Sequence, residues 1–105
     1  MSKPTIYAID FDGTLCTNKW PDIGLENMKL IEFLKAERKA GNKVILNTMR
    51  EGRLLEEALA WCRRNGLEFD AVNDNLPEVV EIYGTNSRKI SCDYYIDDKA
   101  LFGWI

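Results

Sequence analysis

Short apolar runs alternate with amphipathic stretches along the chain, and this alternation predicts a parallel α/β fold. Four apolar runs are predicted to be buried strands, at 5–9, 43–47, 69–72 and 92–96. Three stretches with apolar residues at helical spacing are predicted to be helices, at 25–40, 52–65 and 76–83. Strands that alternate with helices form parallel sheets with right-handed crossovers. The segment 11–24 is rich in turn-forming residues and is expected to be a loop.

One domain is expected to span residues 1–105, because the chain shows no linker, repeat or low-complexity tract. Hydrophobic residues make up 46% and charged residues 30% of the chain, a balance typical of a folded globular protein. The fourteen Lys and Arg residues are scattered among seventeen acidic ones, for a net charge of −3. We therefore expect no extensive nucleic-acid surface, although the phosphorylated end of a strand stays a candidate substrate.

The residue types that are missing or rare exclude several kinds of chemistry. The chain has no histidine, which rules out Ser-His-Asp and Cys-His machinery and any zinc site with histidine ligands. Cys16, Cys62 and Cys92 are widely spaced and form no CxxC motif, so a disulfide framework is not expected. The N-terminus does not resemble a signal peptide, and no apolar stretch is long enough to cross a membrane. These features predict a cytoplasmic protein without membrane contacts.

The residues that directly follow each predicted strand are candidate site residues, because ligands of parallel sheets bind beyond the carboxyl ends of the strands. They are Asp10, Asp12 and Thr14 after the first strand, Thr48 and Arg50 after the second, Asn73, Asp74 and Asn75 after the third, and Asp97 and Asp98 after the fourth. Three of the four strands thus deliver polar groups suited to one acidic, metal-binding pocket. Asn73 and Asn75 are expected to form turns rather than to contact substrate.

Four short motifs resemble, in order, those of the haloacid dehalogenase (HAD) superfamily of phosphohydrolases. They are Asp10-Phe11-Asp12-Gly13-Thr14-Leu15 after a strand, Thr48 after another strand, Lys89 before the last strand, and Asp97-Asp98 after it. Within that superfamily the chain looks like small uncharacterised hydrolases of bacteria and phages. The resemblance implies a three-layer Rossmann-like HAD core with about four parallel strands. Numbered along the chain, these strands would have the order 3-2-1-4 in the sheet.

The resemblance assigns different roles to the two carboxylates of the first motif. Asp10 would attack phosphorus and form an aspartyl-phosphate, a reaction that a carboxylate can perform directly. Asp12 would act as the general acid and base. Gly13 lets the chain turn sharply because it has no Cβ, and Gly13 and Thr14 are expected to contribute to substrate binding.

A Mg²⁺ cofactor is expected, because several anions in one pocket repel each other unless a cation lies among them. Oxygen ligands of this kind suit Mg²⁺, which keeps several of its waters and bridges to a phosphate. The resemblance implies that the side chains of Asp10 and Asp97 and the backbone carbonyl of Asp12 bind the metal. Asp98 would contribute from further away.

The cation beside the phosphoryl group has more than one candidate. The family motif favours Lys89, but Arg88 and Lys99 also flank the last predicted strand. Thr48 is expected to hydrogen-bond a phosphate oxygen, and the chosen lysine to offset negative charge there. Arg50 is either a phosphate or substrate contact or a surface residue at the start of the second helix.

No cap domain fits into the chain. Residues 13–24 suffice for a turn and a small flap, and residues 49–88 are already used by a helix, a strand and a short helix. An open site takes a bulky substrate, is closed by a second copy in a homo-oligomer, or is unselective. Trp20 lies in the flap and is expected either to stack on a substrate ring or to fold back on the core.

The function predicted from these features is a Mg²⁺-dependent phosphomonoester phosphatase. Its substrate would be a small phosphorylated molecule or the phosphorylated end of a larger one. A non-enzymatic phospho-acceptor similar to receiver domains stays open, because these share an acidic Mg²⁺ site, a Thr and a Lys on a similar core. A phosphate-binding module on the same fold is a further alternative. Asp12 favours the phosphatase, since receiver domains lack an acid two residues after the phosphorylated one.

Overall fold

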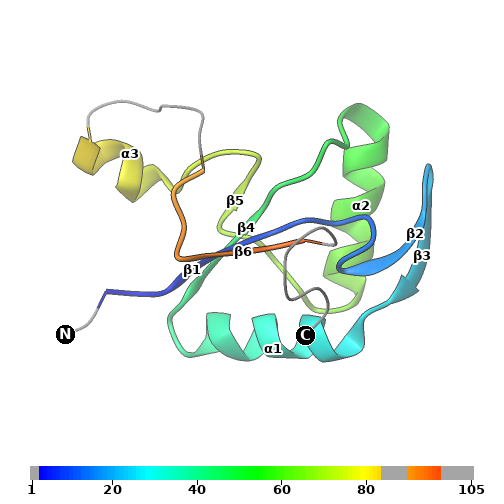
Figure 1. Cartoon of the computed structure of the whole chain (residues 1–105), viewed down its shortest axis with the longest axis horizontal. Coiled ribbons are helices and arrows are strands. Elements are labelled where there is room, and N and C mark those ends of the chain that lie inside the picture. Colours follow the sequence, from blue (N-terminus) through cyan, green and yellow to red (C-terminus); the bar gives the residue numbers. More distant parts are fainter. Residues whose placement is uncertain (1–2, 84–89, 98–105) are drawn as a thin grey trace.

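A four-stranded parallel sheet forms the centre of the protein in the computed structural model, which describes residues 3–83 and 90–97 (Figure 1). The strands are β1 (Ile6–Ile9), β4 (Lys43–Leu46), β5 (Ala71–Val72) and β6 (Tyr94–Ile96). Their order in the sheet is β5-β4-β1-β6, and each neighbouring pair is parallel. These are the four predicted strands, so the expected order 3-2-1-4 is confirmed.

Helices lie on both sides of the sheet. They are α1 (Met28–Lys39), α2 (Gly52–Arg64) and α3 (Pro77–Tyr83), close to the three predicted ranges. Figure 1 shows α1 below the strands and α3 above them. None of the helices within 3–83 and 90–97 is long and apolar enough to cross a membrane.

The central strands are buried on both faces, which explains their continuous apolar sequences. Tyr7, Ile9, Val44 and Leu46 belong to one buried cluster that also contains apolar side chains of α1 and α2. The residues that alternate with these along the strands, Ala8 and Ile45, are fully buried as well. Since successive side chains of a strand point to opposite faces, the two sets cover both faces of the sheet.

An antiparallel hairpin occupies much of the segment that was expected to be a loop, and that prediction was wrong. The hairpin consists of β2 (Cys16–Lys19) and β3 (Asp22–Glu26), joined by Trp20 and Pro21. Periodicity did not indicate it, because most of its residues are polar and exposed. The hairpin also delays the start of α1, which was expected at residue 25 but begins at Met28.

Gly24 is required by close packing within the hairpin, not by a turn. A Cβ at this position would overlap Thr17 Oγ1 and the Thr17 carbonyl oxygen. The register of the two strands shifts between Cys16 and Asn18, which brings Thr17 close to the facing strand. The Thr17 hydroxyl also accepts a hydrogen bond of 2.8 Å from the Leu25 amide.

An arginine–aspartate pair joins α1 to the sheet. Arg38 Nη2 and Nε of α1 donate to the two Asp70 carboxylate oxygens at 3.0 and 3.3 Å. Asp70 Oδ2 also accepts a hydrogen bond of 2.8 Å from the Val44 amide of β4. Although partial burial acts to raise the pKa of Asp70, these hydrogen bonds outweigh it and lower the pKa below its ordinary value.

Candidate active site

The carboxyl ends of the parallel strands meet at one edge of the sheet, where most of the predicted site residues lie. The strand register pairs Ile9 of β1 with Leu46 of β4 on one side and with Ile96 of β6 on the other. Backbone hydrogen bonds continue just past these pairs. The Asp10 amide donates to the Ile96 carbonyl at 3.0 Å, and the Asn47 amide donates to the Ile9 carbonyl at 2.8 Å.

Asp10 and Asp97 are neighbours at this edge, although 86 residues separate them in the sequence. Each directly follows one member of the Ile9–Ile96 pair in adjacent parallel strands. The nearby phenol of Tyr95 is affected by both carboxylates. Burial raises the pKa of Tyr95 above its ordinary value, a hydrogen bond with Asn47 acts to lower it, and the charges of Asp10 and Asp97 raise it further.

Tyr95 is a site residue that the sequence reasoning missed. Its hydroxyl accepts a hydrogen bond from the Asn47 side chain, so it connects β6 to the end of β4. The signal that could have identified it is the spacing of two residues to Asp97, because residues two apart on a strand share a face.

Asp10 and Asp97 are the neighbouring acidic residues at this edge that could hold a metal. Among the residues that the structure describes, no group of three or more Cys, Asp or Glu side chains could hold a metal. Asp10 and Asp97 directly follow paired residues of adjacent strands, so their backbones lie side by side. Mg²⁺ is typically bound through one or two carboxylates and keeps several waters. Asp98, the further predicted contributor, lies outside the described residues.

Asp12 is paired with Arg50. Arg50 Nε donates to Asp12 Oδ2 at 2.9 Å, and Nη2 donates to Oδ1 at 2.8 Å. The Arg50 side chain is completely buried, whereas that of Asp12 is 19% exposed. The hydrogen bonds to Asp12 raise the pKa of Arg50 above its ordinary value although burial acts to lower it, so the guanidinium stays charged.

Arg50 also contacts the hairpin and α2. Nη2 donates to the Asp22 carbonyl of β3 at 3.0 Å, and Nη1 donates to the Leu54 carbonyl in the first turn of α2 at 3.3 Å. The guanidinium carbon lies 5.0 Å from the ring centroids of both Phe11 and Trp20, within the range of cation–π interactions. The predicted substrate contact of Arg50 stays a prediction, but the alternative of a surface residue was wrong.

Thr48 is held in place at the end of β4 by the neighbouring strand. Its amide donates to Asn73 Oδ1 at 2.7 Å, and its hydroxyl accepts a hydrogen bond of 3.1 Å from the Arg50 amide. Asn73 has a left-handed backbone conformation with φ of 53°, which agrees with the expected turn. Its side chain does more than form the turn, because it orders the loop that carries Thr48.

Gly13 and Thr14 form a tight turn next to Asp12. Gly13 has a φ of 82°, a left-handed conformation that glycine adopts without strain. The Thr14 and Leu15 amides both donate to the Phe11 carbonyl, at 3.1 and 3.0 Å. Thr14 is buried, and its hydroxyl has no hydrogen-bond partner among the described residues. Their expected contact with substrate stays a prediction.

Trp20 lies at the tip of the hairpin and is not folded into the core. Its side chain is 54% exposed, while its ring contacts the Arg50 guanidinium. Met49, which directly precedes Arg50, is 96% exposed.

Lys89, the predicted cation of the site, lies outside the described residues, as do the alternatives Arg88 and Lys99.

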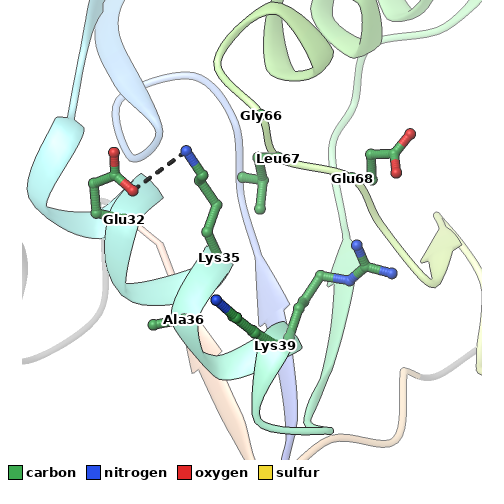
Figure 2. Close-up of a pocket in the computed structure, with 8 residues that line it drawn as sticks. Glu32, Lys35, Ala36, Lys39, Gly66, Leu67 and Glu68 are labelled. Atoms are coloured by element: carbon green, nitrogen blue, oxygen red, sulfur yellow. Dashed lines mark ion pairs between the residues drawn. The ribbon is translucent and has the colours of Figure 1, made fainter.

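A pocket of about 560 Å³ lies elsewhere, between α1 and the turn that follows α2 (Figure 2). It is lined by Glu32, Lys35, Ala36, Arg38, Lys39, Gly66, Leu67 and Glu68, none of which is a predicted site residue. Its charges are already largely balanced, because Lys35 pairs with Glu32 at 3.3 Å and Arg38 pairs with Asp70. The chemistry of the strand ends therefore marks the candidate site better than this pocket does.

The chain is similar to a conserved bacterial protein whose structure has been solved. No protein-family model matches the chain, and no curated protein matches it. A solved structure of a conserved protein coded by a locus of Bacteroides thetaiotaomicron is 42% identical, with a TM-score of 0.82. The match covers 96% of this chain and 81% of that one. At this identity and coverage, the chain belongs to the same protein family as the conserved Bacteroides thetaiotaomicron protein.

Proposed function

We propose that the protein is a capless member of the HAD superfamily and a Mg²⁺-dependent phosphomonoester phosphatase. The observation that carries this proposal is the pairing of Ile9 with Ile96, which makes Asp10 and Asp97 neighbours at the carboxyl edge of the sheet. Asp12 and Thr48 belong to the same edge, since both contact Arg50. A carboxylate nucleophile, a second acid and a hydroxyl group are the parts that phosphoryl transfer through an aspartyl-phosphate requires.

The chemistry takes two steps. Asp10 forms a bond to phosphorus while the bond from phosphorus to the leaving oxygen breaks, and Asp12 gives that oxygen a proton. Water then attacks the phosphorus and gives a proton to Asp12, while the bond between Asp10 and phosphorus breaks and inorganic phosphate leaves. The partial exposure of the Asp12 carboxylate supports this assignment, because the group is reachable from solvent.

The two neighbouring carboxylates would hold the metal, with Asp98 and the Asp12 carbonyl as further contributors. When bound, Mg²⁺ would offset the negative charge of the carboxylates and of the phosphoryl oxygens. Thr48 would donate a hydrogen bond to a phosphoryl oxygen, and Lys89 would add a positive charge beside it.

The substrate we propose is a small phosphorylated molecule or the phosphorylated end of a larger one. The hairpin is the one segment between the first motif and α1, which supports an open site that a bulky substrate or a second copy of the chain could cover. The exposed part of Trp20 offers a surface for an aromatic ring of the substrate. The three cysteines are free thiols, which suits a reducing cytoplasm.

A panel of phosphate esters tests the proposal. The panel holds p-nitrophenyl phosphate, sugar phosphates, nucleotides and oligonucleotides with 3′- or 5′-phosphates, each with Mg²⁺ and with excess chelator. We expect turnover that requires Mg²⁺, and trapping of beryllium fluoride on Asp10 but not in an Asp10→Asn variant. Turnover of no compound, undiminished turnover in chelator, or beryllium fluoride on another residue would contradict the assignment.

A phospho-acceptor remains the second candidate because of the way Asp12 is bound. Both Asp12 oxygens accept hydrogen bonds from Arg50, which leaves fewer lone pairs for a water that would remove the phosphoryl group from Asp10. Incubation with acetyl phosphate separates the two functions. A phosphatase releases many equivalents of phosphate per chain, whereas an acceptor stops at one phosphoryl group that stays on Asp10.

A further inference from the structure

Arg50 connects three parts of the molecule that are far apart in the sequence. Its guanidinium binds both oxygens of Asp12, the Asp22 carbonyl of the hairpin, and the Leu54 carbonyl of α2. These contacts use four of the five N–H groups of the guanidinium. The faces of the same group meet the Phe11 and Trp20 rings.

The burial of Arg50 decides what this group can do. Its side chain has no exposed surface, and its two shortest hydrogen bonds are already made to Asp12. A substrate phosphate could reach the guanidinium only by displacing Asp12 or the hairpin. Removing it, in contrast, would leave Asp12 without a partner in a partly buried position.

We infer that Arg50 is a positioning residue that fixes the Asp12 carboxylate and the β2–β3 hairpin as one unit. This inference rests on the proposed function for its effect on catalysis, but the mechanical coupling does not. Arg50 acts on the reaction through Asp12, whose direction toward the reacting atoms it sets with two parallel hydrogen bonds. It acts on the hairpin through the Asp22 carbonyl and the Trp20 ring.

Arg38 supplies a matched control. It forms the same two-bond contact with Asp70, at 3.0 and 3.3 Å, but its pair joins α1 to the sheet and contacts none of the site residues that the structure describes. The variants Arg50→Gln and Arg38→Gln both replace a guanidinium by a neutral amide. If the loss of any arginine–aspartate pair causes an effect, both variants show it. If the effect comes from the positioning of Asp12, only Arg50→Gln shows it.

Kinetics with p-nitrophenyl phosphate test the action through Asp12. We expect Arg50→Gln to lower kcat about 10- to 100-fold with KM changed less than about threefold, and Arg50→Lys to recover part of the loss. The double variant Asp12→Asn/Arg50→Gln should be no slower than Asp12→Asn within about threefold, because residues that act as a unit are not additive. Arg38→Gln should keep kcat within about twofold. A KM rise above tenfold with unchanged kcat, or additive losses in the double variant, would overturn the inference.

Hydrogen exchange tests the coupling without any activity. We expect amides of 16–26 to exchange about tenfold faster in Arg50→Gln than in the native chain, and to be unchanged in Arg38→Gln, with β1 amides as the internal reference. Should Arg50→Gln not fold, Trp20→Ala in the folded chain serves instead, and its hairpin should also exchange faster. Unchanged hairpin exchange would overturn the inference even if the phosphatase is active. Faster exchange in a chain that hydrolyses nothing would support the coupling and refute only the proposed function.

Discussion

At the residue scale, two arginine–aspartate pairs form the same two-bond contact but have different roles. The Arg50–Asp12 pair lies at the carboxyl edge of the sheet with the arginine side chain fully buried. The Arg38–Asp70 pair lies at the start of β5, with 31% and 17% of the two side chains exposed. The first pair belongs to the candidate site. The second has a structural role, since Asp70 also binds the Val44 amide of β4.

The free energy of unfolding should depend on pH in part through the ionisation of the Asp70 carboxylate. Its hydrogen bonds lower its pKa in the folded state, so the carboxylate contributes stability above its unfolded pKa of about 4 and loses that contribution as the pH falls through the folded value. We expect Asp70→Asn to lower the free energy of unfolding by about 1.5–3 kcal/mol at pH 7, the scale of hydrogen bonds to a charged group. Urea unfolding of the native chain and of Asp70→Asn between pH 7 and pH 3 measures this difference in the free energy of unfolding.

The difference between the two chains should shrink below about pH 4, because protonation removes the charge from the native carboxylate as well. Glu32→Gln is the comparison, since Glu32 forms an exposed pair with Lys35 and should change the stability much less. A difference for Asp70→Asn that stays constant down to pH 3 would contradict the role of the charged carboxylate.

The hairpin is the element on which the shape of the site depends. It is short and mostly polar, so its stability comes from close contacts rather than from burial. Gly24 has a backbone conformation open to other residues, but a Cβ there would overlap Thr17. We expect Gly24→Ala to lower the free energy of unfolding by about 1–3 kcal/mol, as over-packing does, when it is measured by urea unfolding.

Gly41→Ala separates a clash from the general cost of replacing a glycine. Gly41 has a φ of 98° and open space around its Cα, so alanine there is strained but meets no atom. Both variants should be destabilised. Only Gly24→Ala should also speed hydrogen exchange in 16–26. Equal exchange in the two variants would show that the Thr17 contact does not hold the hairpin.

At the scale of the whole molecule, folding brings two like charges together. Asp10 and Asp97 become neighbours only when β1 and β6 pair, so the folded protein should bind Mg²⁺ better than the unfolded chain does. With Mg²⁺ at about one hundred times its Kd, linkage predicts a rise of about 2.7 kcal/mol in the free energy of unfolding. Thermal or urea unfolding with and without Mg²⁺ measures this effect and requires no substrate.

Asp97→Asn should remove most of the stabilisation by Mg²⁺, because one carboxylate of the pair is lost. Glu68→Gln changes an acid in the distant pocket beside α1 and should leave the stabilisation intact. If Mg²⁺ stabilises the native chain and Asp97→Asn equally, Asp97 does not contribute to a metal site.

The elements with strong periodicity could be predicted from the sequence, and the polar ones could not. The buried strands around Ala8 and Ile45 are apolar on both faces, and α2 begins at Gly52 as expected, because burial imposes a pattern on the residues themselves. β2 and β3 lack that pattern. Their pairing depends on contacts such as the close approach of Gly24 to Thr17, which no local window reveals.

The sequence alone determined which residues follow the strands, and therefore that Asp10, Thr48 and Asp97 lie along one edge. This works because the ends of parallel strands meet at one edge whatever the loops do. Only the tertiary structure decided the partners of the side chains. Arg50 could bind a substrate, face solvent or bind Asp12, and its choice depends on burial among α2, the hairpin and Phe11. A long, flexible side chain has many partners within reach, and three-dimensional packing selects among them.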